Sequence, residues 1–191
     1  MMPWHRQLVL ALWLLWLIYW RVSAVGVKPA RRVQSPLSRT LHIAPLVLAG
    51  LLLWIGPMRG AGLLFQRFLA RSAGAYWCGL ALLVLGLGFS IWARMTLGRN
   101  WSASVTVKHD HQLICTGPYA WVRHPIYSGV LLAFIGTAVV RGDWCGVLAV
   151  LIVLVTFWRK LRLEERWMIE TFGDDYRRYR QRTAALIPLL L

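Results

Sequence analysis

The chain has 191 residues, of which 58% are hydrophobic, and it carries a formal net charge of +15. A chain this apolar is not an ordinary soluble domain, and its 12 tryptophans and basic connections are typical of an integral membrane protein with aromatic belts. The arginines flank apolar spans, which argues against nucleic acid as a partner and favours contact with anionic membrane lipids.

Five apolar segments separated by polar or basic connections predict an all-α, multi-pass membrane protein with about five transmembrane helices. The predicted spans are residues 8–24, 41–57, 75–97, 125–140 and 144–158, and the last continues as a helix to about residue 171. A tight turn, Arg141-Gly142-Asp143, joins spans four and five into a helical hairpin. A charged helix follows in the C-terminal region.

The distribution of basic residues predicts the orientation. With five spans, one side of the membrane carries five Lys and Arg residues and the other side carries seventeen. The positive-inside rule then places the N-terminus outside and the C-terminus in the cytoplasm. We expect a prokaryotic cell membrane as the location.

The polar run from Thr116 to Gly129 combines turn residues, titratable groups and aromatic side chains. Pro125 suits the first position of a helix, so span four is expected to begin there. The free N–H groups of its first turn would point back towards Arg123 and His124 and attract an anion such as a carboxylate. Gly129, one turn into the helix, is expected to let a ligand lie close to the backbone.

This run resembles the G-P-Y-x-x-x-R-H-P-x-Y-x-G signature of the isoprenylcysteine carboxyl methyltransferase family, which consists of small integral-membrane enzymes that use S-adenosylmethionine. The resemblance covers the second half of the chain in detail and the first half only in hydropathy. It is weaker for the substrate, because relatives that methylate other membrane-bound acceptors share the core. The match continues outside the run at residues 111–115, Glu164-Glu165, Phe172-Gly173, Tyr176, Tyr179 and Ile187-Pro188.

The resemblance implies two parts: transmembrane helices one to three within residues 1–97, and a catalytic part within residues 98–191. The expected cofactor is S-adenosylmethionine, and alignment on Phe172-Gly173 assigns the cofactor-binding acid to Glu164, with its neighbour Glu165 left open. The remaining residues expected to bind the cofactor are His111, Gln112, Leu113, Ile114, Tyr119, His124, Pro125, Ile126, Tyr127 and Gly129.

The acceptor site departs from the family pattern. Where the eukaryotic branch has a substrate-facing arginine one helical turn before the acid, this chain has Lys160. Lysine lacks the planar fork of arginine, so either Lys160 or Arg123 is expected to orient the acceptor. The predicted catalytic residues are therefore Arg123, Lys160 and Glu164.

The resemblance favours methyl transfer to the carboxylate of a lipophilic, isoprenylcysteine-like acceptor at the cytoplasmic face. A carboxylate is already a nucleophile at neutral pH, whereas an amine acceptor would need a base, for which His124 or Glu165 are the candidates. The alternatives are a phospholipid or other amine N-methyltransferase, and a non-enzymatic lipid-binding or transport protein. No metal site is expected, and the oligomeric state is left open.

Overall fold

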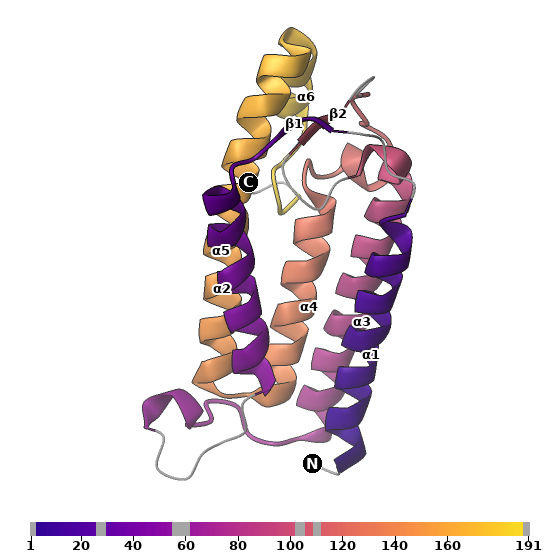
Figure 1. Cartoon of the computed structure of the whole chain (residues 1–191). Coiled ribbons are helices and arrows are strands. Elements are labelled where there is room, and N and C mark those ends of the chain that lie inside the picture. Colours follow the sequence, from indigo (N-terminus) through magenta and orange to yellow (C-terminus); the bar gives the residue numbers. More distant parts are fainter. Residues whose placement is uncertain (1–2, 26–29, 55–61, 102–105, 109–111, 189–191) are drawn as a thin grey trace.

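The computed structural model describes residues 3–25, 30–54, 62–101, 106–108 and 112–188. Long helices lie side by side as a bundle, and the C-terminal part of the longest one projects beyond one end together with a short last helix (Figure 1). They are α1 (Pro3–Ser23), α2 (Pro36–Trp54), α3 (Ala73–Leu97), α4 (Pro125–Arg141), α5 (Trp144–Phe172) and α6 (Asp174–Arg182). The predicted helical membrane fold is confirmed.

The short elements lie in the connections. Three single 3₁₀ turns are η1 (Leu63–Phe65), η2 (Gly98–Asn100) and η3 (Gly117–Ala120). Strands β1 (Ala30–Val33) and β2 (Thr106–Lys108) pair antiparallel and add a small two-stranded sheet that hydropathy did not predict. The sheet, η3 and α6 lie at the same end of the bundle as the first turns of α2 and α4 (Figure 1).

Local sequence fixes the ends of the helices in the second half of the chain. Pro125 stands at the start of α4, as predicted, and the Asp143 side chain caps α5 by accepting from the Gly146 N–H at 3.0 Å. Gly142 and Gly173 end α4 and α5 with φ of 66° and 55°, a region that favours glycine. These stops produce the predicted α4–α5 hairpin and separate α6 from α5.

Three helices of the described part are long and apolar enough to cross a membrane: α2, α3 together with η2, and α5. The fourth, α4, is apolar but has only 17 residues. The remaining long helix, α1, is continuous but contains tryptophans and Arg6, which lower its mean hydropathy. All five helices nevertheless coincide with the five predicted spans; residues 55–57, the end of predicted span two, lie outside the described residues.

Helices α3 and α4 pack closely because glycines face each other across their contact. A Cβ built on Gly129 would lie 2.5 Å from the Gly86 carbonyl oxygen and 2.7 Å from the Ser90 nitrogen. Gly136 and Gly79 make the same kind of contact one level further along, at 2.5 Å. Small residues allow such close backbone approach between membrane helices. The expectation that Gly129 lies beneath a ligand is therefore wrong, because its open side is occupied by α3.

Candidate active site

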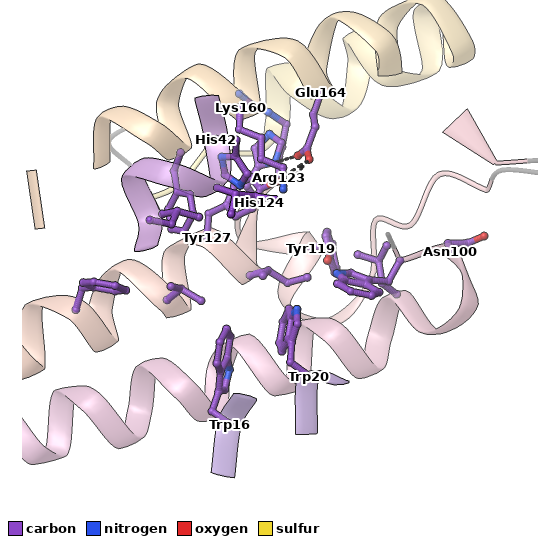
Figure 2. Close-up of a pocket in the computed structure, with 18 of the residues that line it drawn as sticks. Trp16, Trp20, His42, Asn100, Tyr119, Arg123, His124, Tyr127, Lys160 and Glu164 are labelled. Carbon is purple, nitrogen blue, oxygen red and sulfur yellow. Dashed lines mark hydrogen bonds and ion pairs between the residues drawn. The ribbon is translucent and has the colours of Figure 1, made fainter. Parts of the chain in front are cut away.

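A cavity of about 670 Å³ lies between α1 and α2, and its other walls come from α4, α5, α6, the end of α3 with η2, and the connection that precedes α4. Away from the sheet its walls are apolar, and Figure 2 shows Trp16 and Trp20 on the side opposite Lys160 and His42. The apolar lining along the bundle comprises Trp13, Trp16, Leu17, Ile43, Leu46, Val47, Gly50, Leu53, Trp54, Val130, Phe134 and Phe157, and Trp20, Leu97, Trp101, Leu113, Ile114, Ile126 and Met168 add apolar surface nearer the sheet. The polar end lies near the sheet and is lined by titratable and aromatic side chains.

Glu164 is the acid that faces this cavity. The Tyr127 hydroxyl donates to its Oε1 at 2.6 Å, and the Lys160 ammonium lies 3.9 Å from the same oxygen. The Nδ1 atom of His124 lies 3.4 Å from the other oxygen. The Glu164 side chain keeps 23% of its surface exposed, so a ligand in the cavity could reach it.

Glu165 points away from the cavity lining and holds Arg123. The two side chains are 7% and 9% exposed, and the Arg123 Nε lies 2.7 Å from the Glu165 carboxylate. Arg180 and the Nε2 atom of His124 approach the same carboxylate at 3.6 and 3.5 Å. Consecutive helical residues point in different directions. This places Glu164, rather than Glu165, where a cavity ligand would lie.

A C-terminal strap, defined as residues 183–186, fixes Arg123 and His124 from the outside. Ala184 forms a parallel bridge with Val122, and the backbone N–H groups of Arg123 and His124 donate to Ala184 and Ala185 carbonyls at 2.8 and 3.0 Å. The Arg123 guanidinium also donates to the carbonyls of Arg180, at 3.1 Å, and Thr183. The strap therefore holds Arg123 and His124 at the N-terminal end of α4.

Electrostatics keep His124 cationic to a higher pH than a free histidine. Burial favours the neutral imidazole, but the carboxylates of Glu164 and Glu165 outweigh it and raise the pKa of His124. Its ring stacks on Tyr127 with centroids 5.5 Å apart. At neighbouring Tyr119, burial raises the pKa of the phenol well above its ordinary value, so this group stays a neutral hydrogen-bonding side chain.

Most of the predicted site residues are brought together here. The structure places Gln112, Leu113, Ile114, Tyr119, Arg123, His124, Ile126, Tyr127, Lys160 and Glu164 on the cavity lining. Pro125 is buried at the start of α4 and is not part of the lining. Gly129 faces α3, Glu165 lies behind Arg123, and His111 lies outside the described residues.

Sequence reasoning missed the walls contributed by the N-terminal helices. On α1, Trp13, Trp16 and Trp20 recur at helical spacing and line the cavity. Trp13 and Trp16 are held by bonds from their indole N–H groups to Thr137 and Ser90, at 3.1 and 2.8 Å. That spacing was a usable signal. His42 of α2 also lines the cavity, and a lone histidine at a predicted membrane interface gave no such signal.

A profile of the phospholipid methyltransferase family matches residues 75–175. The chain is 34% identical over 114 residues to a protein-S-isoprenylcysteine O-methyltransferase of Schizosaccharomyces pombe, covering 58% of this chain and 48% of that protein. It is 30% identical over 134 residues to a probable protein-S-isoprenylcysteine O-methyltransferase of Oryza sativa subsp. indica, covering 66% and 70%. The chain thus spans about half the length of the yeast relatives it matches.

The fold is shared with a solved structure. This is the eukaryotic intramembrane Ras methyltransferase, an isoprenylcysteine carboxyl methyltransferase, which superposes with a TM-score of 0.57 at 24% identity. The likeness covers 84% of this chain and 55% of that one.

Proposed function

This chain belongs to the phospholipid methyltransferase family, in its isoprenylcysteine carboxyl methyltransferase branch, and on that basis we propose that it transfers a methyl group from S-adenosylmethionine to the carboxylate of a lipophilic, isoprenylcysteine-like acceptor. The observation that carries the proposal is a single cavity whose polar end, with Glu164 and Lys160 on its wall, continues into a long apolar part.

The polar end suits S-adenosylmethionine. The exposed edge of Glu164 would pair with the amino group or ribose hydroxyls of the cofactor, and Tyr119, Tyr176 and Tyr179 offer aromatic surface nearby. Gln112 and the residues that follow it would line the other side of the cofactor. Bound there, the cofactor would supply a methyl group activated by the positive charge on its sulfur.

Lys160 is the residue that we assign to the acceptor carboxylate. Arg123 shares its guanidinium among Glu165 and two backbone carbonyls, so we give it a positioning role. The Lys160 ammonium lies over the Tyr127 ring at 5.2 Å and 3.9 Å from Glu164, so its charge is partly shared. A shared cation orients a carboxylate without holding it so tightly that it loses reactivity.

The residues would act mainly by alignment. Holding acceptor and donor in line and excluding water can contribute on the order of 7–11 kcal/mol to the lowering of a barrier. No base is required for a carboxylate acceptor. The two groups that could act as a base towards an amine are occupied, since His124 lies between two carboxylates and Glu165 is paired with Arg123. This occupation favours the carboxylate acceptor over a phospholipid amine.

We further propose that the polar end faces the cytoplasm of a prokaryotic cell, with the N-terminus outside. The sequence count of basic residues supports this orientation, because seventeen of the Lys and Arg residues fall on the side of β1, β2, η3 and α6. In this orientation the soluble cofactor would reach the polar end from the cytoplasm, and the acceptor's chain would lie in the apolar part.

The acceptor chemistry is tested by supplying methyl-labelled S-adenosylmethionine and either N-acetyl-S-farnesyl-cysteine or phosphatidylethanolamine to the purified protein in liposomes. A methyl ester releases volatile methanol on treatment with base, whereas a methylated amine releases none. We expect base-labile label with the prenylcysteine only, and strongly reduced label in Lys160→Met. Base-stable label on the lipid amine would establish the N-methyltransferase alternative instead.

A further inference from the structure

We propose that His42 of α2 is an acceptor-binding residue, which contacts the carboxylate head of the acceptor together with Lys160. The inference rests on the proposed function and extends it to a helix outside residues 75–175, the part that the family profile matches. His42 would therefore contribute to the acceptor preference of this particular chain.

His42 stands where the cavity changes from polar to apolar. The other residues that the described part of α2 contributes to the lining carry no polar side chain, and they follow His42 towards the far end of the helix: Ile43, Leu46, Val47, Gly50, Leu53 and Trp54. Figure 2 shows His42 beside Lys160, across the cavity from Trp16 and Trp20. An amphiphilic acceptor with its tail in the apolar part would place its head at this level.

A series of ring contacts connects the His42 side chain to the polar end of the cavity. Its ring lies 6.4 Å from that of Phe157, which stacks on Tyr127 at 4.7 Å, and Tyr127 stacks in turn on His124 at 5.5 Å. The series runs from α2 through α5 to α4. Lys160 lies against the Tyr127 ring in this series, so the imidazole and the ammonium share one wall.

The imidazole has unused hydrogen-bonding capacity. His42 is only 7% exposed, and its Nδ1 atom has no hydrogen-bond partner among the residues that the structure describes. Leaving a buried polar atom unpaired is costly, and a native structure rarely does so without a reason. Rotation about the Cβ–Cγ bond, a soft torsion, would turn this nitrogen towards the cavity.

The neighbouring charges select the ligand's chemistry. Lys160 adds a cation at this wall, and the nearest acid, Glu164, is already approached by Lys160, His124 and Tyr127. An imidazole N–H beside an ammonium would favour an anionic head over the ammonium head of a lipid amine. A carboxylate, with two oxygens, could accept from both groups.

The test compares two ligands that differ only in their head: N-acetyl-S-farnesyl-cysteine, as substrate, and its carboxamide, as a competing ligand. The variant His42→Phe keeps the ring contact with Phe157 and removes both nitrogens. We expect its KM for the carboxylate to rise about tenfold, the loss of one hydrogen bond to a charged group. The Ki of the carboxamide, whose neutral carbonyl accepts a weaker hydrogen bond, should rise no more than about threefold, and the Kd of S-adenosylmethionine should stay within about twofold.

His42→Gln, which restores an N–H at a similar distance, should recover most of the carboxylate affinity, and His5→Phe, at the other end of the bundle against Tyr76, should match the wild type. If His42→Phe does not fold, the KM of the carboxylate and the Ki of the carboxamide are measured in His42→Leu instead. An unchanged carboxylate KM, or an equal loss for both ligands, would overturn the inference and leave His42 a packing residue. A wild-type protein that forms no base-labile ester would instead overturn the proposed function, and this inference with it.

Discussion

At the scale of residues, Arg123 and His124 each serve the site through their partners. Arg123 lines the cavity but is bonded to Glu165 and to the carbonyls of Arg180 and Thr183. His124 bridges the two carboxylates at 3.4 and 3.5 Å. This arrangement orients Glu164 towards the cavity, since its neighbour is held on the other side. The contacts of Arg123 and His124 thus give these two residues of the signature a role in positioning Glu164.

Arg123→Lys should destabilise the folded protein by about 1–3 kcal/mol, because a lysine ammonium cannot serve a buried carboxylate and two carbonyls in the directions of the guanidinium fork. The measurement is the midpoint of thermal unfolding in detergent. The matched control is Arg177→Lys, whose partner Asp174 lies in an exposed pair with side chains 61% and 77% accessible. That control should change stability little. Equal effects of the two substitutions would contradict the clamp role of Arg123.

The choice between Glu164 and Glu165 shows the limit of sequence reasoning at this scale. Both acids follow the same span, and alignment on the sequence did not decide between these two neighbouring positions. Which of two consecutive helical residues faces a cavity depends on how α5 is rotated against α2 and α4, and no local pattern encodes that rotation. The same reason explains Gly129, whose position was predicted but whose packing partner, α3, was not.

At the scale of elements, the helices were predictable and their contacts were not. Apolar runs bounded by Pro125, Gly142 and Gly173 mark the second-half helices in the sequence, because these residues begin or end helices for backbone reasons. The C-terminal strap and the β1–β2 pair join segments about 60 and 75 residues apart through backbone hydrogen bonds. Such pairing leaves no periodic signal in either segment.

The glycine contact between α3 and α4 should not tolerate a single methyl group. A Cβ on Gly136 would lie 2.4 Å from the Leu83 nitrogen and 2.5 Å from the Gly79 carbonyl oxygen, and both are backbone atoms that cannot move aside easily. Gly136→Ala should therefore lower the unfolding free energy by about 1–3 kcal/mol. Gly88→Ala, on the same helix pair but with open space around it, should be neutral or slightly stabilising. Equal unfolding midpoints for Gly136→Ala and Gly88→Ala would contradict this packing.

At the scale of the whole molecule, one cavity joins the polar end of the bundle to its apolar interior, and the proposed function needs that polar end to face the cytoplasm. The two ends of the bundle can be distinguished chemically. Cys115 lies in the connection at the polar end and is partly exposed, whereas Arg71 precedes α3 at the opposite end.

In a Cys78→Ser, Cys145→Ser background, a membrane-impermeant maleimide should label Cys115 in inside-out vesicles and not in right-side-out vesicles. Burial raises the pKa of the Cys115 thiol, so labelling is expected to be slow near neutral pH and faster as pH rises. The control Arg71→Cys, in a chain that also lacks Cys115, should give the reverse pattern. Labelling of Cys115 only in right-side-out vesicles would contradict the proposed orientation and support the opposite one.

The central claim is that the polar end of this cavity, through Glu164, holds S-adenosylmethionine. The most direct measurement is calorimetric titration of S-adenosylmethionine into the detergent-purified wild type, Glu164→Gln and the control Glu170→Gln, which lies exposed on the same helix. We expect the wild type and the control to bind alike, and Glu164→Gln to lose roughly 1.5–3 kcal/mol, the range for a hydrogen bond to a charged group. A folded wild type that does not bind, or a Glu164→Gln variant that binds as tightly as the wild type, would contradict the claim.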